Sequence, residues 1–370
     1  MPLTGRYIAA VVGALLVLTA ARSVIGTVIV PRPVGSWLTR WVDWLVGSAY
    51  HMATHLISNH VRRDQVLAGQ AAAILLMQIV VWLAIFFVGF SLVLWPFNPG
   101  GITTAFATTG PALFEIGSAR EQGAAIRAIL DIASLTSLIT ITLQIAYLPT
   151  LYSAFNRRET EVALLNARAG VPSWGPELLA RTHYALGSGV SSISTLPGLY
   201  EEWERWAADV TESHTTYLPL VRFRSPRPMS SWVTALLAVL DSAALYLALS
   251  PAGAPTVPAR LCLRSGFLCF EQVGRAMRLN FPEEPDPAAG ISLSYEQFLD
   301  AIAVLRKVDF PIEREPAEAW PDFVGWRVNY EQAAYALAYA IDVVPAKWSG
   351  PRRHPRPEVA PTRPPYGKPK

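Results

Sequence analysis

Residues 65–97 read QVLAGQAAAILLMQIVVWLAIFFVGFSLVLWPF, and this stretch decides the fold class of the chain. From Gln65 to Trp95 it contains no Lys, Arg, Asp or Glu. A helix rises about 1.5 Å per residue, so about 20 apolar residues cross a bilayer core about 30 Å thick. The stretch therefore predicts a membrane-spanning helix that ends at an interface with Trp95-Pro96-Phe97.

Two more segments have this character. The first, from Tyr7 to Val30, could be read as a secretory signal peptide with a cleavage site near Thr19-Ala20-Ala21. Its apolar stretch resumes at residues 24–30, which is too long for a signal peptide and favours a span. The other runs from Ile126 to Tyr152. It overlaps residues 128–156, a stretch in which Asp131 is the only charged residue.

The overall composition agrees with a membrane protein. Of the 370 residues, 52% are hydrophobic and only 16% are charged, against about 25% in soluble proteins. The net charge of +3 is too small to favour a nucleic-acid partner. We therefore expect a chain with three spans and the lipid bilayer as its surroundings.

Residues 31–64 predict an amphipathic segment at the membrane interface. Pro31-Arg32-Pro33 breaks the first span, and Trp37, Trp41 and Trp44 then share one helical face. Tryptophan is enriched at membrane interfaces. His51 and His55 are spaced to bind a metal, but no third ligand is nearby, so we expect no metal there.

The arginine distribution predicts the orientation. Residues 31–67 contain Arg32, Arg40, Arg62 and Arg63, and the third span is followed by Arg157 and Arg158. The positive-inside rule places both segments in the cytoplasm. The N-terminus and residues 96–125 would then lie outside a plasma membrane, with the C-terminal domain inside.

Residues 156–348 predict a helical cytoplasmic domain, making the chain all-α. Helical patterns lie near residues 158–169, 176–188, 197–213, 229–249, 258–279, 294–307 and 329–343. Trp232 to Ser250 is apolar enough for a fourth span, but Asp241 at its centre would cost about 3 kcal/mol in lipid. We favour a buried bundle helix in which Asp241 is paired with an Arg, a His or a hydroxyl from another helix.

Two further features belong to this domain and its end. Cys262 and Cys269 lie two helical turns apart, about 10 Å, which is too far for a disulfide, and predict buried thiols. Residues 349–370 form a basic, proline-rich tail. Such a composition predicts disorder, with contact to anionic lipid as one role.

The segment between the second and third spans is the most informative. Asn98-Pro99-Gly100-Gly101 makes a turn, and Gly101 to Ala119 is too short to cross and return as two helices. Its first part can form a short re-entrant helix, and its second part is rich in Thr, Gly and Ala. Non-helical backbone at membrane depth needs protein or a water-filled cavity beside it, as in a selectivity filter. We therefore expect a pore loop over residues 98–119.

The order of interfacial helix, outer span, pore loop, inner span and cytosolic domain resembles the two-span potassium channel pore family over about residues 36–155. Residues 145–159 also look like bacterial membrane proteins described as channel-like. The family's filter pattern is Thr-Val-Gly-Tyr-Gly. Ile116 and Gly117 fit it, whereas Glu115, Ser118 and Ala119 replace the Thr, the Tyr and the second Gly. The resemblance implies four subunits around one axis.

The expected pore residues follow from this resemblance and from the inner span. The pore-loop residues are Thr109, Gly110, Phe114, Glu115, Ile116, Gly117, Ser118 and Ala119. Along the inner span, Thr136, Thr140 and Gln144 form a polar stripe with Tyr147. Such a stripe faces a cavity, which makes these residues pore-lining, or it hydrogen-bonds to another helix.

Glu115 is the residue with the sharpest expected role. Fourfold symmetry would place four Glu115 carboxylates in one ring that favours cations, binds divalent ions and responds to pH. The alternative is that Glu115 turns away, bonds to the pore helix or to Arg120, and leaves a closed plug.

These features favour a homotetrameric pore for monovalent cations, K+ among them, with a cytosolic regulatory domain. The alternative is a non-conducting membrane anchor or sensor with a degenerate pore loop. An enzyme is disfavoured because the chain has no Gly-rich phosphate loop, Cys/His cluster or nucleophile elbow, and we expect no cofactor. Residues 213–217, Ser-His-Thr-Thr-Tyr, end a helix or contribute to a small site.

Overall fold

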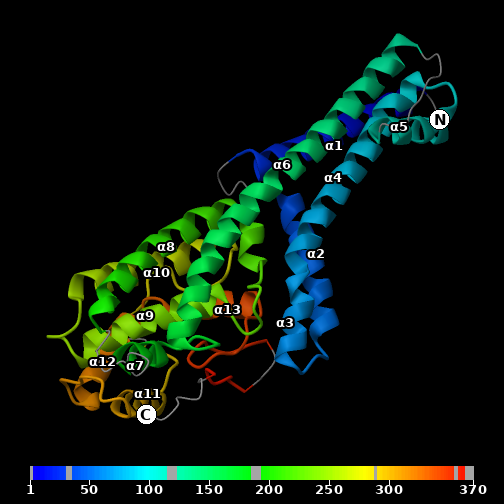
Figure 1. Cartoon of the computed structure of the whole chain (residues 1–370). Helices are drawn as coiled ribbons and strands as arrows, with labels where there is room; N and C mark the ends of the chain where they lie inside the picture. Colours follow the sequence, from blue (N-terminus) through cyan, green and yellow to red (C-terminus); the bar gives the residue numbers. More distant parts are fainter. Residues whose placement is uncertain are drawn as a thin grey trace. The chain divides into compact units, whose positions relative to one another are not determined.

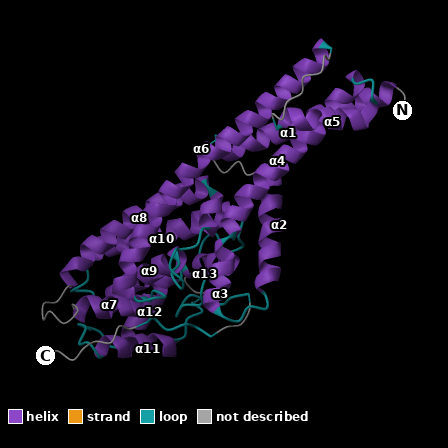
Figure 2. Ribbon diagram, turned by 45° about the vertical axis from the view of Figure 1, so that its right-hand side comes forward, coloured by secondary structure: helices purple, strands orange, loops and turns teal. Residues whose placement is uncertain are grey.

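The computed structural model describes residues 3–30, 36–114, 123–184, 193–286, 290–353 and 357–362. Figure 1 shows the labelled helices, and Figure 2 shows that the described residues form helices and loops without strands. The helices are α1 (Leu3–Val28), α2 (Trp37–Thr54), α3 (His60–Ala68), α4 (Gln70–Leu94), η1 (Trp95–Phe97), α5 (Gly101–Leu113), α6 (Ala124–Ala169), α7 (Gly175–Tyr184), η3 (Ile193–Thr195), α8 (Leu196–Thr216), η4 (Leu218–Arg222), α9 (Trp232–Leu249), α10 (Thr256–Ala276), α11 (Tyr295–Arg306), α12 (Pro316–Arg327) and α13 (Glu331–Ala340). The all-α expectation is confirmed for these residues.

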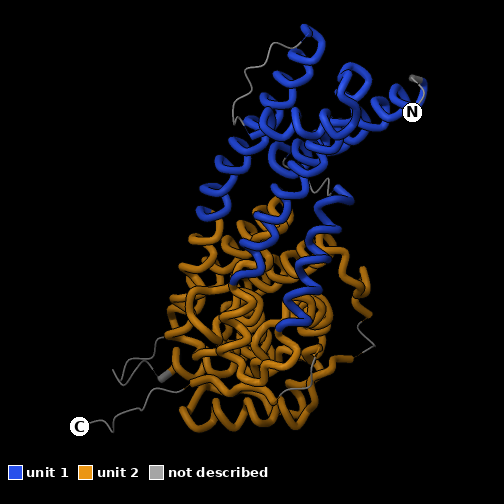
Figure 3. The backbone as a smooth tube through the Cα atoms, turned by 90° about the vertical axis from the view of Figure 1, so that its right-hand side faces the viewer, with its two compact units in different colours: residues 1–53, 69–153 blue, residues 54–68, 154–370 orange. Residues whose placement is uncertain are grey.

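The chain folds as two compact units, coloured separately in Figure 3. Unit 1 comprises residues 1–53 and 69–153, and unit 2 comprises residues 54–68 and 154–370. The sequence predicts one change of character near residue 155, and the last boundary between the units lies there, after residue 153. It does not predict that residues 54–68, which precede α4, belong with the C-terminal helices.

Among the described residues, four helical segments are long and apolar enough to cross a membrane: Thr4–Val28, His60–Phe97, Ala124–Ala169 and Trp232–Leu249. The chain is therefore that of a multi-pass membrane protein. The most apolar windows of the first three are 22%, 33% and 28% buried, whereas that of the fourth is 100% buried. Three segments thus present apolar side chains outward, and the fourth is enclosed by protein.

Helices α1 and α4 of unit 1 approach each other closely at two glycines. A Cβ atom added to Gly13 would lie 2.5 Å from the Gly89 carbonyl oxygen, and one added to Gly89 would lie 3.0 Å from the Gly13 carbonyl oxygen. Small residues permit such contacts between membrane helices. On the same pair, Trp82 Nε1 donates a hydrogen bond to Ser23 Oγ at 3.0 Å, which satisfies the buried indole.

We expect Gly13→Ala to destabilise the protein by about 1–3 kcal/mol, because the new methyl group has to push α1 and α4 apart. Gly110→Ala is the matched control, since a Cβ there would meet Phe87 at an ordinary 3.6 Å. Thermal unfolding of the purified chain in detergent measures both. Equal stability of the two variants would contradict the close contact.

Helix α2 lies alongside α4 within unit 1. Near the start of α2, Leu38 shares a buried cluster with Trp82, and near its end a Cβ on Gly47 would lie 3.6 Å from Gln70 Nε2. The two helices therefore run antiparallel. The tryptophans that the sequence places on one face are exposed on the other side of α2: Trp37, Trp41 and Trp44.

Helix α5 is a short helix that lies in sequence between two apolar helices of spanning length, α4 and α6. Its 13 residues extend about 20 Å, less than the bilayer core of about 30 Å. Phe106 of α5 packs edge-on against Phe87 of α4, with ring centroids 5.2 Å apart. Near the end of α5, the Ser134 hydroxyl of α6 donates a hydrogen bond to the Ala112 carbonyl oxygen at 2.7 Å. These contacts fix α5 between α4 and α6.

Helix α9 is the centre of unit 2. All of its 18 residues are buried, and it packs against α7, α8, α10, α12 and α13. Two glycines let neighbours approach: a Cβ on Gly266 of α10 would lie 2.5 Å from Leu240, and a Cβ on Gly175 of α7 would lie 2.8 Å from the Ala238 oxygen. This burial explains an apolar sequence that resembles a span.

The prediction that Asp241 is paired inside the bundle is confirmed. Arg327 of α12 forms an ion pair with it, and the Tyr330 hydroxyl donates to its Oδ1 at 2.9 Å. Arg327 also donates to Glu331 Oε2 at 2.7 Å and to the Trp348 carbonyl oxygen at 2.7 Å. The charged side chains of this centre are therefore paired with one another, as buried charges require.

The sequence patterns did not predict α12, which supplies Arg327. Pro316 and Pro321 lie in this segment and argue against a helix in a pattern reading. Pro316 instead occupies the start of α12, where a missing N–H costs nothing, whereas Pro321 lies inside the helix, where it removes one backbone hydrogen bond.

The end of the chain also differs from expectation. Arg352 Nε donates to the Val343 carbonyl oxygen at 2.6 Å, and Thr362 N donates to the Val171 carbonyl oxygen at 3.0 Å. Residues 349–353 and 357–362 are thus structured parts of unit 2 rather than a disordered tail, and residues 363–370 lie outside the described residues. Cys262 and Cys269 are buried free thiols, as expected.

Candidate functional site

The predicted pore-loop residues are only partly described. Thr109 is buried on α5 and donates a hydrogen bond to the Ala105 carbonyl oxygen at 2.9 Å. Gly110 is half-buried one residue further on, and Phe114 is 51% exposed at the end of the helix. The expected filter residues Glu115, Ile116, Gly117, Ser118 and Ala119 lie outside the described residues, so their roles stay predictions.

The predicted inner-helix residues differ in burial along α6. Its buried side chains recur alternately three and four residues apart: Leu130, Ala133, Ser137, Thr140, Gln144 and Tyr147. Thr136 lies beside this stripe and is half-buried, with its hydroxyl bonded to the Ile132 carbonyl oxygen at 2.7 Å. Thr140 bonds back to its own helix, and Gln144 Oε1 has no hydrogen-bond partner among the described residues.

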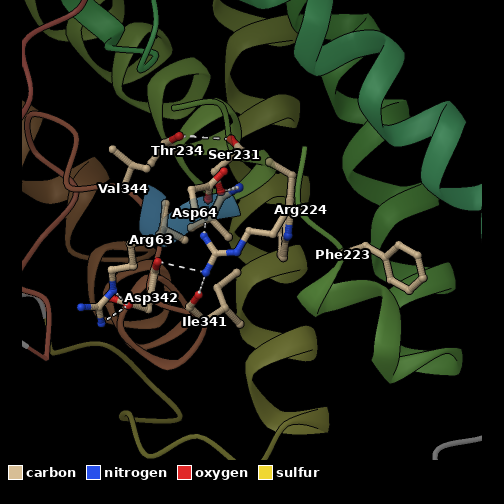
Figure 4. A network of polar contacts seen from close by, with 12 residues as sticks. Arg63, Asp64, Phe223, Arg224, Ser231, Thr234, Ile341, Asp342 and Val344 are labelled. Atoms are coloured by element: carbon tan, nitrogen blue, oxygen red, sulfur yellow. Dashed lines mark hydrogen bonds and ion pairs between the residues drawn. The ribbon is translucent and has the colours of Figure 1, made fainter. Parts of the chain in front are cut away.

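A second polar arrangement, in unit 2, was not predicted as a site. It is centred on Arg224, which follows η4, and Figure 4 shows its side chain directed at Asp64 of α3. Arg224 Nη1 pairs with Asp64 Oδ1 at 2.8 Å, and Nη2 donates to the carbonyl oxygens of Ile341 and Asp342. One arginine therefore joins three separate segments of the chain.

Arg63 completes this connection from the neighbouring position on α3. It forms a buried ion pair with the Asp342 carboxylate and donates through Nη1 to the Thr54 carbonyl oxygen at 3.1 Å. Burial lowers the pKa of Arg224 below its ordinary value, and the carboxylates of Asp64 and Asp342 act in the opposite direction. Both arginines are thus held by two carboxylates, with all four side chains at most 10% exposed.

Arg158 lies on the part of α6 that belongs to unit 2 and binds the segment that directly precedes Arg224. It is 1% exposed and pairs with Glu159. Its Nη1 donates to the Leu220 carbonyl oxygen at 2.8 Å, and its Nη2 donates to the Phe223 carbonyl oxygen at 2.7 Å. Since Arg224 comes directly after Phe223, the loop is bonded to α6 through Arg158 and to α3 through its own Arg224.

We call Arg63, Asp64, Arg158, Arg224 and Asp342 the coupling network. Its importance lies in which helices it joins. α3 is followed, after Gly69, by the apolar helix α4. α6 is itself the third apolar segment, and its last part belongs to unit 2. The network thus joins, inside unit 2, the two chain segments that continue into the apolar helices. Charged networks with full sets of partners resist partial rearrangement, so α3 and α6 are held in one geometry.

His214 of α8 supports this network. Arg158 Nη1 lies 2.9 Å from His214 Nε2, and Ser213 Oγ lies 3.0 Å from Nδ1. Arginine can only donate, so Nε2 accepts and the neutral ring carries its proton on Nδ1. Burial, and then the charge of Arg158, hold the pKa of His214 well below its usual range.

We expect His214 to make the protein less stable in mild acid. The unfolded chain protonates this histidine near pH 6.5, whereas the folded chain keeps it neutral. The unfolded state therefore binds more protons below that pH, and stability falls by up to about 1.4 kcal/mol per pH unit. Chemical unfolding of the wild type and of His214→Gln at pH 7.5, 6.5 and 5.5 tests this, and parallel pH profiles would refute it.

The sequence contains one signal for the network. Arg63 and Arg158 follow the positive-inside pattern, which predicts a location for them but not their partners. Arg224 and Asp342 lie in loops without a periodic pattern. No group of three or more His, Cys, Asp or Glu residues that could hold a metal exists in the described part of the chain.

Comparisons with known protein families, with curated proteins and with solved structures found no match to this chain.

Proposed function

We propose that this protein is a channel-like protein of the plasma membrane, in which α4, α5 and α6 form the pore module of a homotetramer for monovalent cations such as K+. Unit 2 is the cytoplasmic regulatory domain. The observation that carries the proposal is α5, a helix too short to span the bilayer that is fixed between two apolar helices of spanning length. The pore loop then follows directly after α5.

In this proposal three segments span the membrane and α9 does not. α9 is enclosed on all sides and contains Asp241 in an ion pair with Arg327, whereas the other three segments expose most of their side chains. The positive-inside rule places residues 31–67 and those after Arg157 in the cytoplasm, with the N-terminus outside. Unit 2 acts on the pore through the coupling network, since changing the distance between α3 and α6 repositions the helices that continue from them.

Reconstitution of the purified protein into liposomes tests the proposal. We expect K+ flux down a gradient, and four chains per particle by light scattering in detergent. Glu115→Gln should change cation selectivity, divalent block and pH response together, because it removes the charge of the proposed ring. A monomeric particle, or flux with the same selectivity, divalent block and pH response in the variant, would overturn the pore assignment.

A second candidate function is a non-conducting membrane anchor or sensor. It is favoured by one observation: Thr140 and Gln144 are buried within a single chain rather than exposed on a surface that could line a pore. Absence of flux from a well-folded protein, together with an intact coupling network, would favour this candidate.

A further inference from the structure

Unit 2 contains a cavity of about 470 Å³ between the end of α9, the start of α10 and the middle of α12. This volume is in the range of small-molecule sites, about 300–1,000 Å³. Its walls are apolar at Leu247, Pro321 and the half-buried Trp326, and polar at Thr256, Arg260 and Asp322. Most ligand pockets combine an apolar lining with a few polar groups in this way.

The two charged residues of the cavity differ in whether they are already paired. Asp322 forms an ion pair with Arg314, which also donates to the Glu318 carbonyl oxygen at 2.9 Å. Arg260 has no carboxylate partner among the described residues. Its guanidinium lies over the Trp326 ring, 5.4 Å from the ring centroid. The uncompensated charge in this cavity is therefore positive.

We propose that this cavity binds a small organic anion that carries a flat ring, of the size of a nucleoside monophosphate. Arg260 pairs with the anionic group, because a guanidinium matches phosphate and carboxylate oxygens in pairs of hydrogen bonds. The ring packs against Trp326 and Pro321. Asp322 accepts hydrogen bonds from ligand hydroxyls, and the Thr256 hydroxyl accepts or donates one.

The position of the cavity gives such a ligand a regulatory role. Trp326 precedes Arg327, which donates to the Trp348 carbonyl oxygen. The segment that contains Trp348 begins at Ile341 and Asp342, where Arg224 of the coupling network binds. A ligand held against Trp326 therefore lies beside the residue that ties α12 to this segment. This regulatory role rests on the proposed function, whereas binding itself does not.

Isothermal titration calorimetry of the full chain in detergent tests the proposal with AMP, GMP, CMP and UMP. We expect saturable binding of at least one of them, at least tenfold tighter than its uncharged nucleoside. Arg260→Gln should weaken that binding tenfold or more. Arg264→Gln is the matched control, since this arginine lies one turn further along α10, over Phe267 at 5.4 Å and outside the cavity.

Two results would overturn the proposal: no saturable binding of any of the four nucleotides, or equal binding by the wild type and Arg260→Gln. Thermal unfolding of both variants verifies that they are folded. Calorimetry measures ligand binding and does not depend on ion flux. The binding proposal can therefore be refuted while the channel proposal stands, and the channel proposal can be refuted while binding is still observed.

Discussion

Replacing Arg327 by Leu is expected to destabilise unit 2 by about 3–5 kcal/mol, because it leaves the Asp241 carboxylate buried without a counter-charge. Both side chains are almost fully buried, at 0% and 2% exposure. The variant also removes the donors to Glu331 and to the Trp348 carbonyl oxygen.

The two cysteines provide the measurement. Cys262 and Cys269 are the only cysteines of the chain, and both are 0% exposed in the core of unit 2. A thiol reagent therefore reacts only when unit 2 opens, and a loss of 3 kcal/mol raises the reaction rate about 100-fold or more. We expect this increase for Arg327→Leu in the full-length protein in detergent.

Two controls separate the charge effect from a general loss of packing. Arg275→Leu removes an arginine that is 43% exposed and pairs with Glu271 and Glu283, and it should cost less than about 1 kcal/mol. Adding Asp241→Asn to Arg327→Leu should recover at least about 1 kcal/mol, since Asp241 then carries no charge and Glu331 is the one carboxylate left without the Arg327 guanidinium. A double variant that is no more stable than the single variant would show that the ion pair is not the cause.

Replacing Arg224 by Leu is the second change with a large expected effect. It leaves Asp64 without its ion-pair partner and two carbonyl oxygens, those of Ile341 and Asp342, without a donor. We expect a local loss of about 3 kcal/mol. Because Arg224 ties α3 to the rest of unit 2, the loss should appear as faster hydrogen exchange in residues 54–68, while α9 keeps its protection.

Arg227→Leu is the matched control for this variant. Arg227 lies three residues further on in the same loop and is exposed. Hydrogen exchange followed by mass spectrometry on both variants gives the comparison. If residues 54–68 exchange at the same rate in Arg224→Leu as in Arg227→Leu, the network does not hold α3 in place.

The same variants bear on the proposed function. In liposomes, Arg224→Leu should change the K+ flux without changing ion selectivity, since the network lies in unit 2 and not in the pore module. Glu115→Gln should instead change the ion selectivity. A channel that responds to neither would have to be regulated elsewhere.

The sequence by itself determined the elements of unit 1 and the class of the protein. A helix in lipid satisfies its own backbone hydrogen bonds, so a run of about 20 apolar residues is sufficient to specify one. For this reason residues 65–97 and the short helix after Gly101 could be predicted without knowledge of their neighbours. The burial of Asp241 followed in the same way, because an isolated carboxylate in an apolar helix must be paired.

Only the tertiary structure decided which residues are the partners. Arg327 lies 86 positions from Asp241 on a helix whose prolines obscure its pattern, and Arg224 meets Asp64 across 160 positions of sequence. Such pairs leave no periodic trace, since an ion pair depends on distance in space and not on spacing along the chain. The same reason explains why Arg63 is part of a network that the arginine distribution along the chain does not reveal.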